Sequence, residues 1–454
     1  MTNHRDPIEQ WLSKDIELLQ PPQGTFRRVR RRARQRKAVQ AAGVAAGVAV
    51  LVAAGAALPR LTSNHSQGGN PYKVGTSSPS HATSGSAKPA SRTPRPSASR
   101  HLLPLSSAGT GERPPAGFRP SSVTFIQQGA LGAVIGQGGP SCGPAPCTVV
   151  AATRNYGQRW TEIAAPPAGP PAGSSGVSQI RFADSRDGWA FGPQLYATHD
   201  GGARWAKITS VGGVVVDLST VSGRVLAVGA AGCKATGAKY AAGCTSFMLY
   251  RARTTRGSWQ TVTGGSGLVT PGALQLTPGY GYLLAGHRLW AGSLRGAWRP
   301  VLVSPASPVT PACLTSAAGH GLIAPTPASS PSGGTLYLVC GVAAGQKRTV
   351  YASGDGGRSW QAGAARGLPA SATATSLAVS PAGPLVLATS AGIYFSTDAR
   401  AWHRAAVHQQ VTGGFGFVGM TTAASGVAVP VNSGLHEVFI TRDGGRSWRR
   451  SVIR

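Results

Sequence analysis

The carboxylates of this sequence are few, and they are the first residues to consider for chemistry. The chain of 454 residues holds 14 aspartates and glutamates against 44 lysines and arginines. A glycosidase normally needs two carboxylates that flank its substrate. After residue 120 the acidic residues are Glu162, Asp184, Asp187, Asp200, Asp217, Asp355, Asp398, Glu437 and Asp443. Their surroundings decide whether they are free for such chemistry.

Four of these aspartates lie in one repeated motif, which favours a structural role. Thr198–Trp205, Ser353–Trp360 and Thr441–Trp448 place Asp and two glycines before a tryptophan, and Ser396–Trp402 is a shorter copy without glycines. Each copy lies between two short apolar runs, a pattern typical of a strand, a tight turn and a second strand. The glycines supply positive-φ positions, the carboxylate can accept hydrogen bonds from turn N–H groups, and the tryptophan can pack between sheets. The candidate structural residues are Asp200, Trp205, Asp355, Trp360, Asp398, Trp402, Asp443 and Trp448.

Weaker copies extend the repeat when the tryptophans are aligned. Motifs with Asn or a hydroxyl residue in the Asp position precede Trp160, Trp259 and Trp298. The seven aligned tryptophans are separated by 45, 54, 39, 62, 42 and 46 residues, a period typical of four-stranded propeller blades. We therefore expect an all-β, seven-bladed β-propeller over residues 120–454. Every predicted blade begins and ends at the same strand of the repeat. We therefore expect the ring to close without an exchanged strand.

These motifs resemble the Asp-box, or BNR, repeat, whose pattern is roughly Ser/Thr-x-Asp-x-Gly-x-x-Trp. The resemblance covers about residues 120–454 and implies a β-propeller. Propellers with this repeat include sialidases, some endoglucanases, sortilin-type receptors and photosystem assembly factors. Their Asp-box is a structural device away from the active site, so the resemblance implies a fold and no particular function.

The remaining acidic residues form no recognisable catalytic set. Outside the repeated motif, a predicted turn at Asp187 and a predicted outer strand that holds Glu162, the candidates are Asp184, Asp217 and Glu437. A sialidase resemblance would imply three arginines on inner strands, and Arg181 is the one expected there. The sequence contains no Gly-x-Ser-x-Gly nucleophile elbow and no Cys/His cluster with zinc-ligand spacing. We predict a protein that is not an enzyme, without catalytic residues, cofactor or metal; a sialidase-like or other glycan-cleaving hydrolase is the alternative.

The N-terminal residues predict a membrane anchor. Residues 1–37 are expected in the cytoplasm, where an apolar stripe predicts an amphipathic helix over residues 5–20 that docks on a cytoplasmic partner or the membrane surface. A weakly ordered tail is the alternative for this helix. Eight of the eleven residues from Arg27 to Lys37 are basic and suit anionic lipid. Residues 38–58 carry no charge and match the bilayer thickness of roughly 30 Å as a transmembrane helix, with the N-terminus cytoplasmic. A cleaved secretory signal or a buried helix are the alternatives.

Residues 59–119 are rich in Ser, Pro and Thr, which predicts a disordered linker. The propeller is then extracytoplasmic in a single-pass cell-membrane protein. Every cysteine lies on that side of the predicted span, which favours disulfides. When the cysteines are assigned to the predicted blades, each expected pair lies within one blade: Cys142–Cys147, Cys233–Cys244 and Cys313–Cys340.

The net charge of +30 raises the question of nucleic acid. Outside residues 27–37, the arginines are scattered singly along the sequence without a basic helix, so we predict no nucleic-acid partner. A propeller face presents loops of several blades around a central depression and suits a protein or a glycan. We therefore expect a membrane-anchored binding or scaffold module at a bacterial cell surface. An extracellular sensor coupled to a cytoplasmic partner is a further alternative.

Overall fold

The structure is a computed structural model, and it describes residues 104–105, 112–115, 117–126, 129–138, 147–171, 173–233, 244–255, 257–316, 320–328, 330–381, 383–432 and 436–453. The predicted helix at 5–20, the basic cluster at 27–37, the predicted span at 38–58 and most of the predicted linker lie outside these residues. Among the residues described, no helix has the length and apolar character needed to cross a membrane.

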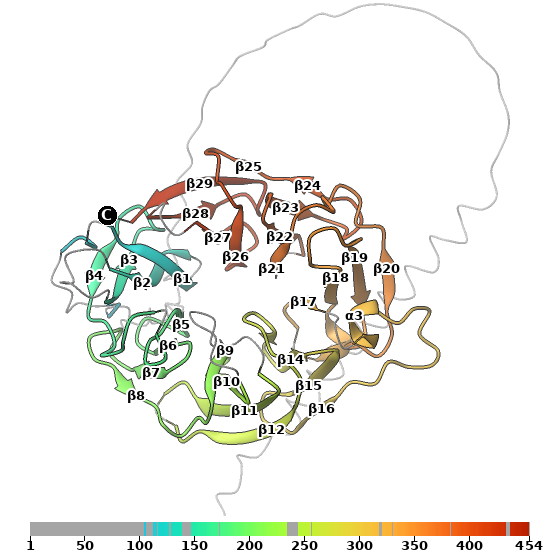
Figure 1. The fold of residues 1–454 in the computed structure, drawn as a ribbon, viewed down its shortest axis with the longest axis horizontal. Coiled ribbons are helices and arrows are strands. Elements are labelled where there is room, and N and C mark those ends of the chain that lie inside the picture. Colours follow the sequence, from blue (N-terminus) through green and yellow to red (C-terminus); the bar gives the residue numbers. More distant parts are fainter. Residues whose placement is uncertain are drawn as a thin grey trace, which may run out of the picture. The chain divides into compact units, whose positions relative to one another are not determined.

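The described strands form seven sheets, each made of strands that are consecutive in sequence and antiparallel except at one edge of the last sheet. The innermost strand of each sheet contacts that of the next, and the last sheet contacts the first. Figure 1 shows the resulting ring of blades in sequence order. The predicted all-β, seven-bladed propeller is therefore confirmed. The prediction that the ring closes without an exchanged strand is also confirmed, because blade 1 and the last blade each contain their own four strands in order.

Blades 1 to 4 consist of β1 (Arg119–Ile126), β2 (Leu131–Gln137), β3 (Thr148–Thr153) and β4 (Thr161–Ile163); β5 (Gln179–Phe182), β6 (Gly188–Phe191), β7 (Leu195–Thr198) and β8 (Ala206–Lys207); β9 (Val214–Val221), β10 (Arg224–Ala231), β11 (Ser246–Arg253) and β12 (Gln260–Ser266); and β13 (Leu274–Leu276), β14 (Tyr280–Ala285), β15 (Arg288–Ser293) and β16 (Trp298–Pro300). Blades 5 to 7 consist of β17 (Gly321–Pro325), β18 (Leu336–Cys340), β19 (Thr349–Ser353) and β20 (Gln361–Gly363); β21 (Ala374–Val379), β22 (Leu385–Thr389), β23 (Gly392–Ser396) and β24 (His403–Arg404); and β26 (Phe415–Met420), β27 (Gly426–Pro430), β28 (Glu437–Thr441) and β29 (Ser447–Val452). The sequence did not predict α3 (Ala312–Thr315), η3 (Pro331–Gly333) or β25 (Ala406–Val407), which pairs in parallel with β29.

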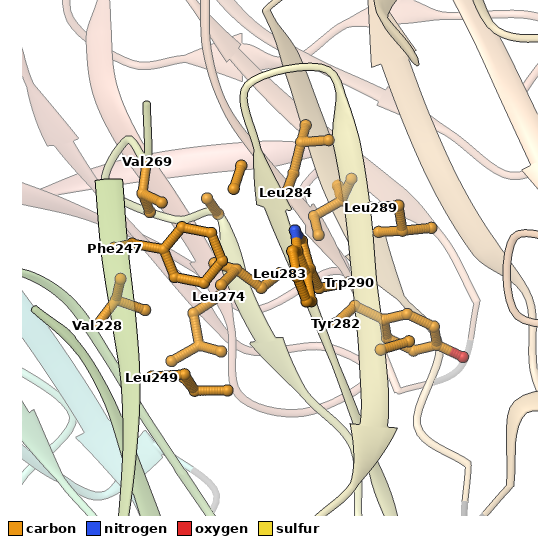
Figure 2. Close-up of a cluster of buried hydrophobic side chains, with 14 of the residues drawn as sticks. Val228, Phe247, Leu249, Val269, Leu274, Tyr282, Leu283, Leu284, Leu289 and Trp290 are labelled. Carbon is orange, nitrogen blue, oxygen red and sulfur yellow. The ribbon is translucent and has the colours of Figure 1, made fainter. Parts of the chain in front are cut away.

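The core lies between neighbouring blades. The second strands, such as β2 and β22, are apolar runs that are buried along almost their whole length because blades cover both of their faces. Figure 2 shows the largest core cluster, where Phe247 of blade 3 faces Trp290 of blade 4. The two rings meet edge to face with centroids 5.6 Å apart, an arrangement that aromatic pairs favour.

The repeated turns pack against the preceding blade. A Cβ added to Gly357 in blade 5 would lie 2.5 Å from Leu289 Cδ2 of blade 4. The φ of Gly357 is also positive, at 96°. Equivalent glycines in the other motifs meet the preceding blade in the same way: Gly157 at Ile440, Gly202 at Ile163 and Gly445 at Val386. Glycine is therefore required at the second position for two reasons. The backbone has a positive φ there, and two blades approach each other too closely for a Cβ.

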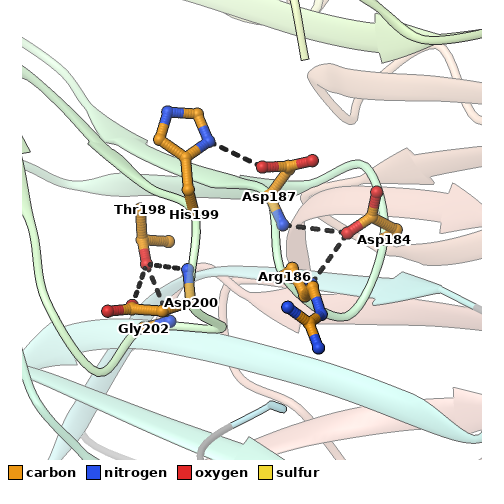
Figure 3. A network of polar contacts seen from close by, with 7 residues as sticks. All are labelled: Asp184, Arg186, Asp187, Thr198, His199, Asp200 and Gly202. Atoms are coloured by element: carbon orange, nitrogen blue, oxygen red, sulfur yellow. Dashed lines mark hydrogen bonds and ion pairs between the residues drawn. The ribbon is translucent and has the colours of Figure 1, made fainter. Parts of the chain in front are cut away.

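The aspartates of the repeated motif accept hydrogen bonds inside their own turns. Asp355 Oδ1 accepts from the backbone N–H groups of Arg358 at 3.0 Å and Ser359 at 2.9 Å. In blade 2, shown in Figure 3, Thr198 Oγ1 donates to Asp200 Oδ1 at 2.9 Å and accepts from Gly202 N at 2.9 Å. These bonds satisfy N–H groups that the turn leaves without a ladder partner.

The tryptophans of the motifs are not equivalent. Trp160, Trp360 and Trp448 are at most 1% exposed and lie between sheets. Trp205, which we expected to be buried in the same way, is only half-buried. The outer strand β8 that follows it has two residues, both exposed. The Trp205 indole instead donates to Ala164 O of the preceding blade at 2.8 Å.

Two of the three predicted disulfides are confirmed, Cys233–Cys244 and Cys313–Cys340. Cys147 is also disulfide-bonded, and its predicted partner Cys142 lies outside the described residues.

The C-terminal part of the predicted linker packs against the propeller. Leu105 is 1% exposed and Phe118 is fully buried, and the Arg154 guanidinium donates to Leu105 O at 2.9 Å. β1 begins at Arg119, one residue before the predicted boundary. These apolar residues among prolines act as part of the core of blades 1, 2 and 7.

Candidate functional site

Blades 1 and 7 are the first and last in the chain, so non-covalent contacts join them; we call this junction the seam. Val134 of β2 and Val438 of β28 belong to one buried cluster that spans it. The Trp160 indole N–H donates to Ser451 Oγ at 3.1 Å. His436 Nδ1 lies 2.5 Å from Phe118 O.

A cleft of about 1080 Å³ opens at the seam, and we call it the seam cleft. Its size lies at the upper end of ligand pockets, which are roughly 300–1,000 Å³. One wall comes from the segment before β1 and the turn between β3 and β4, and the other comes from β29 and the turn that precedes it. Its lining includes five arginines: Arg113, Arg159, Arg442, Arg449 and Arg450. Such a concentration of guanidinium groups favours carboxylate or phosphate ligands.

Two of these arginines have partners in the described structure. The Arg442 guanidinium lies 5.4 Å from the centre of the Tyr156 ring across the seam. Arg450 Nε lies 3.5 Å from Glu437 Oε2. Burial raises the pKa of Glu437 above its usual value, although Arg450 acts in the opposite direction.

The other three arginines of the cleft are exposed. Arg113, Arg159 and Arg449 have no ion pair or side-chain hydrogen bond with any residue in the described ranges. Their guanidinium groups are therefore available to an anionic ligand. Two of them belong to the blade 1 wall and one to blade 7.

Asp443, the one acidic residue among the described residues that line the cleft, is held by its own turn. It accepts from Ser447 N at 2.9 Å, Ser447 Oγ at 2.5 Å and Thr441 Oγ1 at 2.8 Å. Burial by itself would raise the pKa of Asp443, but these hydrogen bonds outweigh it and lower the pKa. The lining therefore offers anion binding rather than a pair of carboxylates for acid–base chemistry.

The cleft also borders an open strand edge. Ile453 N donates to His436 O on the β28 side, whereas His408 N donates to Trp448 O on the opposite side. Because peptide groups alternate in direction along a strand, the N–H and C=O groups of Arg450 and Val452 point away from β28. No described residue bonds to these outward groups. Beyond β25, this edge of blade 7 is therefore unpaired as far as the described residues show.

The structure keeps the three candidate acids of the sequence apart, in blades 2, 3 and 7. Asp184 caps the turn between β5 and β6 and accepts from Arg186 N at 2.7 Å and Asp187 N at 2.9 Å, as Figure 3 shows. The carboxylate oxygen Oδ1 of Asp187 lies 2.6 Å from His199 Nδ1. Glu437 is the buried partner of Arg450.

Asp217 joins blade 3 to blade 4. It is 2% exposed, and its two carboxylate oxygens accept from Leu218 N at 2.9 Å and Leu274 N at 2.8 Å. Burial raises its pKa to about 6, with the backbone hydrogen bonds and Arg181 opposing the rise. Arg181 on β5 is itself directed toward the rings of Phe191 and Phe417, 5.9 and 5.4 Å from their centres. These contacts are structural ties between blades.

Within the described ranges, no group of three or more His, Cys, Asp or Glu side chains is arranged to hold a metal ion. The sequence alone missed the arginines of the seam cleft, which we had described as scattered. They are scattered in sequence, and closure of the ring brings them together. Alignment of the motifs offers a signal, because Arg159 directly precedes Trp160 and Arg449 and Arg450 directly follow Trp448.

No protein-family model matches the sequence, and a search of curated proteins gives no match. Among solved structures, YCF48 bound to D1 peptide is 16% identical, with a TM-score of 0.48 over 73% of this chain and 94% of that chain. YCF48 from Cyanidioschyzon merolae is 11% identical, with a TM-score of 0.47 over 73% of this chain and 98% of that chain. The GH74 xyloglucanase from Xanthomonas campestris is 14% identical, with a TM-score of 0.28 over 72% of this chain and 63% of that chain. The assignment of the fold rests on the seven sheets of this chain, and no function is carried over from these structures.

Proposed function

We propose that this protein is a membrane-anchored binding module of the Asp-box type, whose exported propeller captures an acidic region of a partner protein in the seam cleft. The observation that carries the proposal is a cleft of about 1080 Å³ lined by five arginines, three of which, Arg113, Arg159 and Arg449, are exposed and have no ion pair or side-chain hydrogen bond among the described residues. Guanidinium groups bind carboxylates in a bidentate geometry, so several of them along one cleft select a partner with several acidic side chains.

Two further features favour a protein partner over a polyanionic glycan or nucleic acid. The open edge of β29 presents backbone groups that an extended polypeptide can pair with. Arg442 lies over one face of Tyr156, the exposed aromatic residue of the cleft, so only part of that ring remains available for stacking on bases.

The membrane anchor and the export of the propeller rest on the sequence. The uncharged run at 38–58 follows the basic cluster at 27–37, and disulfides persist mainly in oxidising compartments. Deletion of residues 38–58 should move the chain from the membrane fraction to the soluble fraction. A chain that is soluble with its natural N-terminus removed at the end of this run would instead indicate a cleaved signal.

Binding is tested with the full chain in detergent micelles and a fluorescent peptide that carries six glutamates. Replacement of Arg113, Arg159 and Arg449 by Ser should raise the Kd about 30-fold, if each exposed ion pair contributes the usual order of 0.2–1 kcal/mol. The matched control replaces three exposed arginines elsewhere, Arg186, Arg288 and Arg366, which removes the same charge. This control should change the Kd by less than about threefold, since distant exposed charges are screened.

Equal losses in both triple variants would mean that the peptide responds to net charge, and the site would be rejected. A polyuronate or a single-stranded oligonucleotide of equal charge serves as a competitor. If either displaces the peptide at a much lower concentration than unlabelled peptide does, the partner is a glycan or nucleic acid and the protein-binding proposal is wrong.

A further inference from the structure

We infer that the partner binds as an added strand along the open edge of β29, with its acidic side chains on the arginines of both walls. Binding then stabilises the closed state of the seam. This inference rests on the proposed function and adds the binding mode. It predicts which backbone groups of the propeller take part and what binding does to the ring.

The backbone evidence is the direction of the peptide groups in β29. Arg450 and Val452 form the non-hydrogen-bonded pairs with β28, opposite Phe439 and Glu437. Their N–H and C=O groups therefore point to the open edge. An extended chain that pairs with this edge gains main-chain hydrogen bonds irrespective of its sequence, and its alternate side chains face the cleft.

The side-chain evidence is the charge on the two walls. Arg113 and Arg159 belong to the blade 1 wall, and Arg449 belongs to blade 7. Arg449 and Ser451 share one face of β29, and Ser451 contacts Trp160 of blade 1, so Arg449 is directed to the seam. Like charges thus line both walls of a junction that no peptide connection crosses. A strand with several carboxylates would neutralise both walls at once.

Because such a ligand contacts both walls, it binds the closed seam more tightly than an opened one. By linkage, the ligand must then stabilise the closed seam. A ligand with a single carboxylate reaches one wall and lacks this effect. The cleft therefore selects an extended segment with several acidic residues rather than an isolated acidic group.

The test compares Val452→Pro with Val452→Ala in the full chain. Proline at this position removes an outward N–H and leaves the ladder with β28 intact, since edge strands accept proline there. Loss of one main-chain bond should raise the Kd for the six-glutamate peptide about tenfold. Val452→Ala keeps the N–H, so the Kd of Val452→Pro is compared with the Kd of Val452→Ala to remove the contribution of the side chain.

Amide hydrogen exchange of the unmodified protein gives a readout that does not depend on the folding of a variant. Saturating six-glutamate peptide should slow exchange at least about tenfold in the fragments that contain Arg449–Ile453 and residues 155–163, which form the two walls. Fragments of β14 and β15 in blade 4 should be unchanged. A peptide of the same length with one glutamate should give no protection of residues 155–163.

The outcomes separate the inference from the proposed function. If the peptide binds with the expected dependence on the cleft arginines, but Val452→Pro folds and binds normally and β29 gains no protection, the added strand is wrong and the binding function stands. If the unmodified protein does not bind the peptide at all, the proposed function itself fails. If β29 is protected but residues 155–163 are not, the strand mode holds and closure of the seam is wrong.

Discussion

Ser451 Oγ, in the last strand of the ring, accepts the indole N–H of Trp160 in the first blade, 291 residues away in the chain. The same hydroxyl donates to the carbonyl of Gly157. In blade 7 the equivalent indole, that of Trp448, reaches the carbonyl of its own turn glycine, Gly445, directly at 3.0 Å. At the seam, a residue of the neighbouring blade has been inserted into this contact, so the turn of blade 1 is tied to the strand that closes the ring.

Replacement of Trp160 at the seam should lower the free energy of unfolding more than replacement of the half-buried Trp205. Trp160 is 1% exposed, so Trp160→Ala should lower the free energy of unfolding by about 3–5 kcal/mol through a cavity between blades 7 and 1. Trp205→Ala should cost clearly less, because that ring is half-buried and water can occupy part of the space. Chemical denaturation of both variants measures the difference. Equal losses would mean that burial between blades does not set the contribution of these tryptophans.

Ser451→Ala tests the inserted contact by itself. The substitution leaves the Trp160 N–H and the Gly157 carbonyl without their shared partner, and an unmade buried hydrogen bond costs about 1–3 kcal/mol. The same denaturation experiment measures it. Ser425→Ala in blade 7 is a suitable control, since no hydrogen bond of the Ser425 hydroxyl crosses the seam in the described ranges. A Ser451→Ala protein as stable as the original would show that the hydroxyl is not needed for closure.

Two of the three glycines in the blade 5 motif, Gly354 and Gly357, allow a matched comparison. Gly357→Ala forces a residue with a Cβ to adopt a φ of 96° and brings that Cβ to 2.5 Å from Leu289 Cδ2. Backbone strain of this kind and overpacking each cost about 1–3 kcal/mol. Gly354→Ala, at a position with open space around the Cβ, should leave the melting temperature nearly unchanged. The prediction fails if both alanines have the same effect.

The spacing of the tryptophans was sufficient to predict the blades, because each blade repeats one local unit of strand, turn and strand. Local patterns could not predict contacts that depend on closure of the ring. Arg113 and Arg449 have nothing in common in sequence, and they line one cleft because blade 1 meets blade 7. The half-buried state of Trp205 was also missed, because its motif is complete and does not distinguish it from the motifs of the buried tryptophans.

Asp217 should give the propeller a defined pH dependence. Its folded pKa of about 6 is above the unfolded value of about 3.9, so the folded state retains a proton that the unfolded state has lost. Its contribution to the free energy of unfolding therefore falls as the pH rises from about 4 to about 6, by about 3 kcal/mol in total. The stability difference between the original protein and Asp217→Asn should shrink over this window. A difference that is constant from pH 4 to 7 would contradict the burial of a titrating carboxyl group.

Asp443 separates the structural role of the motif from the binding role of the cleft. Asp443→Ala leaves the Ser447 N–H and hydroxyl without the acceptors they have now at 2.9 and 2.5 Å, so the free energy of unfolding should fall by about 1–3 kcal/mol. The same change removes the one negative charge that the described residues contribute to the lining of the seam cleft, so the Kd for the six-glutamate peptide should stay the same or decrease. Thermal unfolding and peptide binding are measured on the same preparation, with Asp355→Ala in blade 5 as the control that destabilises a turn away from the cleft. If Asp443→Ala keeps its melting temperature and loses binding, the carboxylate acts on the ligand, and the structural interpretation of the motif is wrong.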